Sequence, residues 1–278
     1  MDLHSGLAFW LVKNPMYNYF HPLVNNHKTE VAVIGSGITG ALVAHELCKA
    51  GIQVSVLDKR TIGTGSTVAS TAQLQYEIDV PLTKMLDIVE EGVAVAAYHA
   101  SLQSIKDIGK VLKDAKVNAD FKNVSSVWLA SYKKDLKLIA KEYKIRQQYD
   151  LPVEYLDEKA VLNKHKINAP GALKNTEAAQ MDAYAAATGL LQHHLDKKEL
   201  EIFTHTEILE WQEVKNGYEL RTKNGHKIQC KYVVIATGFE AGQFLPKKVM
   251  QLQSTYALVS KPVHMWIAIA SLFWVEID

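Results

Sequence analysis

Three glycines are spaced so that the backbone around them is suited to binding phosphate. Gly35, Gly37 and Gly40 form a G-x-G-x-x-G pattern. In such a turn the first glycine permits a tight bend, the second lets the backbone approach a pyrophosphate, and the third allows a helix to pack closely on a strand. The free N–H groups at the start of that helix attract the phosphates. The candidate phosphate-binding residues are Gly35, Ser36, Gly37, Ile38, Thr39 and Gly40.

A carboxylate follows where a ribose ligand is expected. Asp58 ends the next β-branched run, 18 residues beyond Gly40, and a carboxylate there accepts hydrogen bonds from ribose hydroxyls. Its charge disfavours a 2′-phosphate, in spite of the neighbouring Lys59 and Arg60. NADP is therefore disfavoured, whereas NAD and FAD both carry free ribose hydroxyls and both stay open at this point.

The hydrophobic pattern predicts the elements that position these residues. Residues 30–35 and 53–58 are short, apolar and β-branched, which is typical of buried strands. A helix is expected between them over 39–50, ended by Gly51. Strand, helix and strand in this order predict a parallel sheet covered on both faces.

The rest of the chain alternates between helical and strand-like segments. We expect a Gly/Ser/Thr-rich loop over 59–71 that is shaped around a ligand, and a helix from 183 to 195 with Asp182 as its N-cap. Between them, the pattern predicts a helical region over 81–112, strand-like pieces within 117–131, a helix over 135–149, a strand after Pro152 and a short helix to about 164.

Two Asn-Gly pairs predict β-hairpins further on. Asn216-Gly217 and Asn224-Gly225 separate three strand-like runs, the first of them read as one strand over 201–214. This three-stranded meander leads into residues 232–238, which are predicted to form another buried strand that ends in a glycine turn.

The composition bounds the class of protein. With 278 residues, 48% of them hydrophobic, the chain has the size and composition of one large or two ordinary globular domains. The formal net charge of +1 gives no overall field toward nucleic acid or an anionic membrane. Two cysteines make no disulfide framework, so a reduced, cytoplasmic setting is expected. The longest apolar run, 265–275, is about half the ~20 residues of a spanning helix, and no signal peptide is recognisable.

No residue stands out as catalytic. The eleven histidines include no H-E-x-x-H and no clustered Cys/His spacing, so no metal site is predicted. G-x-S-x-G and P-loop lysine motifs are absent too. Cys48 and Cys230 are read as small core residues. The segment after the loop offers Glu77 and Asp79, for which facing a substrate cavity and capping the following helix are equally weighted. Gln73 and Tyr76 are similar and slightly better cavity candidates.

With these motifs the sequence resembles the FAD-dependent oxidoreductases of the D-amino-acid oxidase superfamily, which includes glycine and sarcosine oxidases and glycerol-3-phosphate dehydrogenase. The resemblance extends to about Lys261 and implies FAD as the cofactor. In that family the loop after the second strand wraps the ribityl chain and the flavin edge, and a β-meander replaces the crossover helix of NAD-type folds. Implied cofactor-binding residues, besides the glycine turn, are Asp58, Lys59, Arg60, Ser66, Ser70, Thr71, Ile208 (in a T-x-V-type strand, Thr206 to Ile208, that offers backbone to the adenine), and Ala236, Thr237 and Gly238 near the dinucleotide.

The resemblance implies an α/β fold: a Rossmann-like FAD-binding domain with a three-stranded β-meander and an inserted α+β substrate domain. The expected division is an N-terminal arm (1–27), an FAD-binding domain (28–82 and 165–245) and a substrate domain (83–164 and 246–278). The implied activity is oxidation of a small amine, amino acid or hydroxy acid by hydride transfer to the flavin. A homo-oligomer is left open.

The match to the family is incomplete at the C-terminal end. Family members usually return to the FAD domain with another glycine-rich loop, and none follows Gly242 here. Three explanations are therefore left open: a truncated form, a frameshifted end and a natural short form. The alternative function is a non-catalytic remnant that binds a dinucleotide and serves as a binding module, with an NAD-dependent dehydrogenase as a weaker third reading.

Replacing Asp58 tests the ribose assignment. We expect Asp58→Ala to weaken FAD binding by roughly 1–3 kcal/mol, the scale of a lost hydrogen bond to a charged group. The measurement is the FAD dissociation constant, and an unchanged value would show that Asp58 does not hold the ribose.

Overall fold

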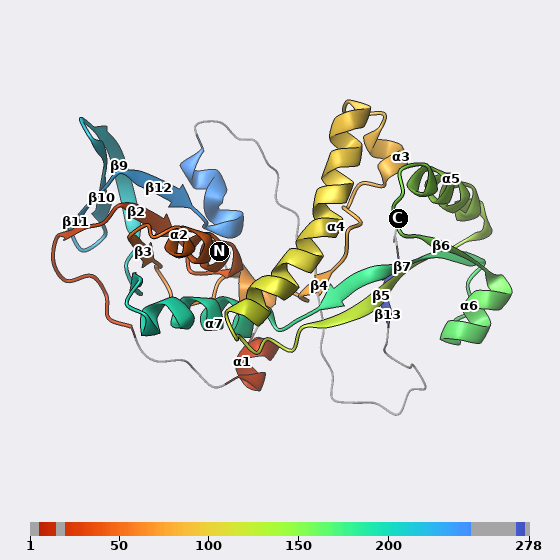
Figure 1. Cartoon of the computed structure of the whole chain (residues 1–278), viewed down its shortest axis with the longest axis horizontal. Helices are drawn as coiled ribbons and strands as arrows, with labels where there is room; N and C mark the ends of the chain where they lie inside the picture. The colour runs from red at the N-terminus through yellow and green to blue at the C-terminus, as the bar shows by residue number, and fades with distance from the viewer. Residues whose placement is uncertain (1–5, 15–19, 246–270, 276–278) are drawn as a thin grey trace. The chain divides into compact units, whose positions relative to one another are not determined.

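The computed structural model describes residues 6–14, 20–245 and 271–275, and the chain divides into two compact units (Figure 1). Unit 1 comprises Met1–Thr71, Leu112–Ala119 and Asp182–Val259; unit 2 comprises Ala72–Val111, Asp120–Met181 and Ser260–Asp278. Residues 72–82 and 165–181, expected in the FAD-binding domain, fall in unit 2 because strands from both segments pair in its sheet.

Unit 1 is built on a four-stranded parallel sheet. Its strand order is β12 (Tyr232–Ile235), β2 (Val31–Ile34), β3 (Val54–Leu57) and β8 (Leu200–Phe203). The first two predicted strands and their parallel pairing are thus confirmed. The single strand expected over 201–214 is wrong: the backbone turns at His205, where φ is 49°, so its two halves enter different sheets.

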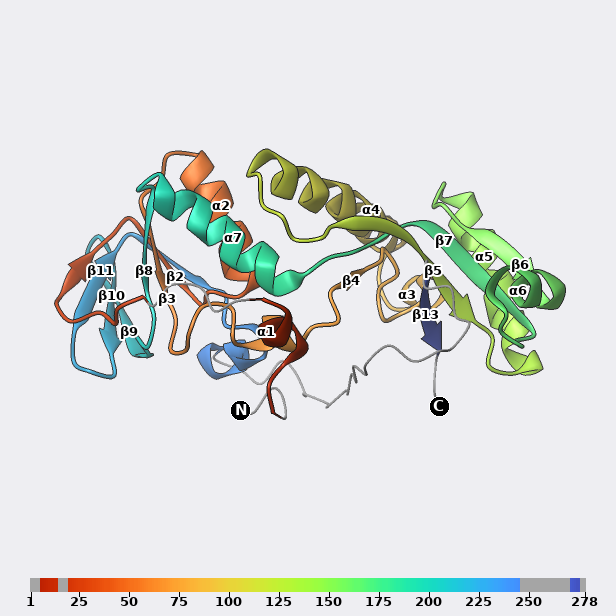
Figure 2. The same ribbon diagram turned by 90° about the horizontal axis from the view of Figure 1, so that it is seen from below.

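Two helices cover one face of this sheet. α2 (Ile38–Lys49) and α7 (Ala183–Asp196) pack side by side, as Figure 2 shows. Both helices were predicted within two residues of these bounds. Asp182 is the predicted N-cap, since its carboxylate accepts a hydrogen bond from the Ala185 N–H (2.9 Å).

The predicted meander covers the opposite face. β9 (Ile208–Val214), β10 (Gly217–Thr222) and β11 (Lys227–Cys230) pair antiparallel, and the short β1 (His27–Lys28) adds to β11 in parallel. Both Asn-Gly turns lie where they were expected. Glycine is required at 217, because φ is +132° and a Cβ would lie 2.1 Å from the Cys230 carbonyl oxygen.

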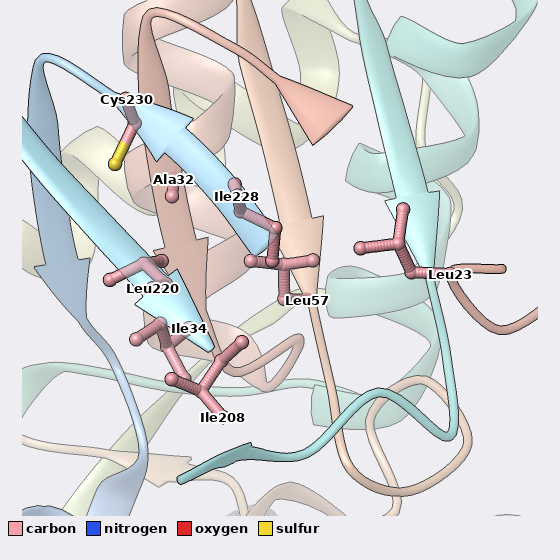
Figure 3. Close-up of a cluster of buried hydrophobic side chains, with 8 residues drawn as sticks. All are labelled: Leu23, Ala32, Ile34, Leu57, Ile208, Leu220, Ile228 and Cys230. Carbon is pink, nitrogen blue, oxygen red and sulfur yellow. The ribbon is translucent and has the colours of Figure 1, made fainter. Parts of the chain in front are cut away.

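The core of unit 1 lies between the meander and the parallel sheet (Figure 3). Side chains that alternate along β2 point to this core, while Val33 lies under Gly40 of α2 on the other face. The buried members of the cluster are Leu23, Ala32, Ile34, Leu57, Ile208, Leu220, Ile228 and Cys230.

β12 differs from its prediction as a buried strand. None of its four residues is buried, and Tyr232 is 63% exposed. Among the described strands it pairs only with β2, and it stands last in the strand order of the parallel sheet. An apolar, β-branched run therefore marks the strand correctly, whereas its place in the sheet decides its burial.

Unit 2 is organised around one long strand that the sequence did not reveal, β7 (Gly171–Gln180). β5 (Lys122–Leu129) pairs with it antiparallel along one side, and β4 (Gln73–Leu74) and β6 (Glu154–Asp157) pair with it antiparallel at separate points. β13 (Ser271–Val275) joins β5 in parallel.

The helices of unit 2 follow the predicted order with one break. The region expected to be helical over 81–112 is two helices, α3 (Leu82–Met85) and α4 (Glu91–Asp114), and α4 runs on into the next segment of unit 1. α5 (Leu136–Gln148) and α6 (Glu158–His165) lie where they were predicted. The remaining short elements are α1 (Phe9–Lys13), η1 (Ser66–Ala69), η2 (Lys133–Asp135) and η3 (Gly238–Phe244).

A buried ion network ties the helices of unit 2 to its sheet. Arg146, 1% exposed, donates to Glu142 (Nε, 2.8 Å) and to Glu77 (Nη1, 2.9 Å). Glu142 also accepts the N–H groups of Leu82 and Thr83 at the start of α3 (3.0 and 2.9 Å). Asn175 of β7 donates to Glu77 (2.9 Å). Each buried carboxylate thus has partners, which is the condition for tolerating such charges in a core.

Arg146→Met tests this network. Removing the guanidinium leaves two buried carboxylates without their counter-ion, so we expect a loss of about 3–5 kcal/mol in the free energy of unfolding. The matched control is Lys164→Met, which removes a cation from an exposed pair with Glu154 and should cost about 1 kcal/mol or less. The measurement is chemical denaturation, and equal losses in the two variants would contradict the assigned role.

Candidate functional site

The glycine turn of unit 1 joins β2 to α2 under severe steric limits. Gly35 has φ +107°, and a Cβ there would lie 2.4 Å from the Ala236 carbonyl oxygen. At Gly40 a Cβ would lie 1.9 Å from the carbonyl oxygen of Gly35. Only a hydrogen atom fits at either position. The turn therefore lies where the sequence predicted it, and for the predicted reason, a close approach that excludes side chains.

The second glycine makes room at the start of α2. Gly37 is the N-cap of α2 and supplies no side-chain cap, and a Cβ would lie 2.8 Å from Thr67 Oγ1. The Ile38 N–H donates to that same hydroxyl (2.9 Å). The first N–H groups of a helix attract anions. Here the first of them faces the loop that follows β3, which contains Thr67.

Asp58 lies in direct contact with the glycine turn. Its Oδ2 accepts hydrogen bonds from the Ser36 N–H (2.8 Å) and hydroxyl (2.5 Å), and its Oδ1 accepts one from the Arg60 N–H (2.8 Å). The carboxyl ends of β2 and β3 meet at one edge of the parallel sheet, which is where open α/β sheets bind ligands. The predicted phosphate and ribose residues are therefore neighbours in space.

The loop over 59–71 folds back onto this turn. The Gly63 N–H donates to Ser36 Oγ (3.2 Å), and Thr67 receives the Ile38 N–H. Ser66 lies beside the second glycine-containing turn, because a Cβ on Gly238 would lie 2.8 Å from Ser66 Oγ. Ser70 and Thr71, the predicted flavin-contacting pair, are exposed at the end of η1. Thr67 was not among the predicted site residues, although the same serine- and threonine-rich stretch contains it.

The turn after β12 contributes a buried hydroxyl. Thr237 Oγ1 is shielded from solvent and has no hydrogen-bond partner in the part of the chain that the structure describes. Its neighbour Ala236 touches Gly35 through its carbonyl, so this unsatisfied polar atom belongs to the same site as the glycine turn. Buried polar atoms without partners are rare. A backbone turn in which Gly35 and Gly40 exclude any Cβ, with the unsatisfied Thr237 hydroxyl beside it, fits the phosphate-rich part of a dinucleotide.

The two cations after Asp58 are both paired with one carboxylate. Arg60 donates to both oxygens of Glu240 (2.9 and 3.0 Å), and Lys59 donates to Oε1 (3.0 Å). The hydrogen bond from Arg60, helped by Lys59, lowers the pKa of Glu240 to about 2. Glu240 lies in η3 and escaped prediction, because 180 residues separate it from Arg60. Its charge offsets the two cations, which agrees with the expectation that no 2′-phosphate binds here.

The T-x-V-type segment lies next to Asp58 through its backbone. The Thr206 N–H donates to the Asp58 carbonyl oxygen (2.8 Å), and its hydroxyl accepts the Leu23 N–H (3.0 Å). The Ile208 side chain is buried in the core of unit 1. Any contact of Ile208 with an adenine ring would therefore come from its backbone, as the resemblance implies.

The four side chains after the loop that were candidates for a substrate cavity differ in their surroundings in unit 2. Tyr76 is fully buried and donates to the Pro152 carbonyl (2.8 Å), and Glu77 holds Arg146, so neither matches the interpretation as a cavity-facing group. Support for the following helix comes from Glu142 instead of Glu77. Gln73 and Asp79 are exposed.

Two further expectations concern thiols and metals. Cys48 and Cys230 are buried, and burial raises the pKa of each thiol to about 11, so both are core residues as predicted. Within residues 6–14, 20–245 and 271–275, no three His, Cys, Asp or Glu side chains are grouped to hold a metal ion. In the same ranges, no helix has the length and apolar character needed to cross a membrane.

The family follows from comparison with known proteins. The profile of the FAD-dependent oxidoreductases (DAO) matches residues 30–276, so the chain belongs to this family and FAD is its cofactor. Glycine oxidase of Geobacillus kaustophilus strain HTA426 is 23% identical over 251 residues, which are 86% of this chain and 63% of that protein.

Two solved structures have the same fold. The crystal structure of glycine oxidase from Geobacillus kaustophilus matches with a TM-score of 0.65 and 21% identity over 78% of this chain and 57% of that one. L-α-glycerophosphate oxidase from Mycoplasma pneumoniae with FAD bound matches with a TM-score of 0.66 and 16% identity, over 78% and 56%. The chain therefore spans a little over half the length of these relatives.

Substituting Gly37 or Gly40 tests the role of the glycine turn in binding FAD. Gly40→Val places side-chain atoms against the Gly35 carbonyl and should abolish FAD binding, as should Gly37→Ala, which displaces Thr67 from the start of α2. The measurement is FAD affinity, with circular dichroism to verify folding. The control is Gly92→Ala in α4 of unit 2, since a Cβ there meets nothing within 4 Å. Normal affinity in a folded Gly40→Val variant would count against the site.

Acid stability tests the Glu240 pair. The folded-state pKa of Glu240 is depressed from 4.5 to about 2, so its stabilising effect is complete above pH 4.5 and is lost as the pH falls toward 2. In Glu240→Gln we expect the unfolding free energy at pH 6 to fall by about 1–3 kcal/mol, and the gap from the wild type to close as the pH falls to 2. The measurement is thermal unfolding against pH, and a gap that is constant across this range would contradict the assignment.

Proposed function

We propose that this protein is an FAD-dependent oxidoreductase that oxidises a small amine, amino acid or hydroxy acid. The observation that carries the proposal is the hydrogen bond from the Ser36 N–H to Asp58 in a chain of the DAO family, which supports Asp58 as a ribose ligand next to a phosphate-binding turn. The relatives named above are a glycine oxidase and a glycerophosphate oxidase, and their names support this range of substrates.

Each part of unit 1 has a role in this proposal. The turn over 35–40 and the start of α2 bind the pyrophosphate through backbone N–H groups, and Asp58 accepts hydrogen bonds from the ribose hydroxyls of the adenosine half. Thr237 gains a partner for its buried hydroxyl. Residues 66–71 bind the ribityl chain and the flavin edge, and the backbone at Ile208 contacts the adenine.

Unit 2 is the substrate domain in this proposal. When bound, the flavin accepts a hydride from a substrate carbon that bears an amine or a hydroxyl, and the protein supplies position and electrostatics. The Arg146 network fixes α3 and α5 against the sheet that would carry the substrate-contacting side chains. We also propose a reduced, cytoplasmic setting, which the two buried free thiols support.

A second candidate is a non-catalytic dinucleotide-binding module. The observation that favours it is that all the candidate cofactor-binding residues lie in unit 1. Such a module would hold FAD through unit 1 and oxidise nothing.

The visible absorbance spectrum of the purified chain separates these candidates. Flavin peaks, with FAD released on denaturation, are expected under both, and bleaching of the flavin by an amino or hydroxy acid without oxygen is expected for the oxidoreductase alone. The control is the Gly40→Val variant, which should be colourless. A wild-type chain that cannot be loaded with FAD would overturn both candidates, and a loaded chain that no member of the substrate panel reduces would overturn the first.

A further inference from the structure

The N-terminal arm of unit 1 is bonded to the loop that leads out of the glycine turn. Here the arm denotes residues 6–14, which contain α1. The Trp10 indole Nε1–H donates to the Ser70 carbonyl oxygen (2.8 Å), a contact that joins residues 60 positions apart. Ser70 belongs to the pair that the proposed function places against the flavin.

The arm also packs against the same loop. Ala8, Val68 and Tyr184 are each less than 10% exposed and form one apolar cluster, with Trp10 and Leu11 packed against it. Val68 lies in η1, so the cluster holds the loop between the arm and α7. The Tyr184 ring also lies at Gly63, where a Cβ would come within 3.0 Å of it. The loop is therefore enclosed by apolar contacts at two points.

A second polar contact fixes the arm itself. Lys13 Nζ (3.1 Å) and Asn14 Nδ2 (2.9 Å) both donate to Oδ2 of Asp182. Asp182 is 1% exposed and uses its other oxygen to cap α7. A charge-assisted contact on a buried carboxylate is stronger than a pair at the surface, so the end of the arm is anchored to a rigid helix and not only to the loop.

The loop in turn contacts the phosphate-binding turn. Thr67, between Ser66 and Val68, accepts the Ile38 N–H, and Gly63 donates to Ser36. Contacts therefore run without a break from the anchored arm through Ser70 and η1 to the first N–H groups of α2. A loop that is ordered before its ligand arrives costs less entropy on binding.

We propose that the arm is a positioning element of the cofactor site, in which Trp10 holds Ser70 and η1 in the geometry that FAD requires. The inference rests on the proposed function, since it assumes that residues 66–71 contact the flavin half of FAD. Trp10 does not touch the cofactor in this role; it acts through the loop. Leu7 and Val12, on the other side of the arm, are 68% and 65% exposed and take no part.

The test compares three variants of the full chain. Trp10→Phe keeps an aromatic ring but loses the N–H donor, Trp10→Ala loses both, and Val12→Ala is a control on the same helix. We expect the FAD dissociation constant to rise about threefold to tenfold in Trp10→Phe, the scale of one hydrogen bond, and further in Trp10→Ala. Val12→Ala should match the wild type. The constant is measured by quenching of flavin fluorescence on titration into cofactor-free protein.

A second measurement separates positioning from a general loss of stability. Amide hydrogen exchange of the cofactor-free protein should become faster over 61–71 in both Trp10 variants and stay unchanged in β2 and β3. Wild-type affinity in both Trp10 variants, or faster exchange throughout unit 1, would overturn the inference and leave the proposed function intact. A wild-type chain that binds no FAD would overturn the proposed function, and the inference with it.

Discussion

The close approach of α2 to the end of β2 is the constraint on which unit 1 depends. The Gly35 carbonyl occupies the space that a side chain at position 40 would need, and the Ala236 carbonyl occupies that space at position 35. Helix α2, strand β2 and the turn after β12 can meet only because these Cβ atoms are missing. The same close approach sets the start of α2, where the Ile38 N–H meets Thr67 of the following loop, beside the turn proposed to bind phosphate.

Two carboxylates near this turn have different partners: one is held mainly by backbone groups, and the other pairs with two cations. Asp58 is bonded to the backbone of Ser36, whereas Glu240 is bonded to the side chains of Lys59 and Arg60. The two carboxylates are not interchangeable. Asp58 accepts hydrogen bonds from two N–H groups and a hydroxyl, whereas Glu240 pairs with two cations. The carboxylate of Glu240 thus occupies the two cations that a 2′-phosphate would otherwise meet.

Unit 2 differs from unit 1, since its helices are linked to a mixed sheet by a buried polar network. Arg146 is surrounded by Glu142, Glu77 and three aromatic rings, and it connects α5 with the segment after β4. Replacing such a network with apolar residues is often tolerated, but removing one member is not. Tyr76 and Glu77, adjacent to a loop rich in functional residues, are thereby structural residues.

The sequence by itself determined the elements whose signals are local: the glycine turn, the strand–helix–strand order, the Asn-Gly hairpins and the Asp182 cap. Each depends on residues within about one element of each other, where sterics and periodicity act directly. Only the tertiary structure decided the exposure of β12, the break at His205, the central place of β7 and the partners of Glu240, Arg146 and Trp10. Those contacts join residues up to 181 positions apart, and no local pattern encodes which distant charge or donor will meet another once the chain has folded.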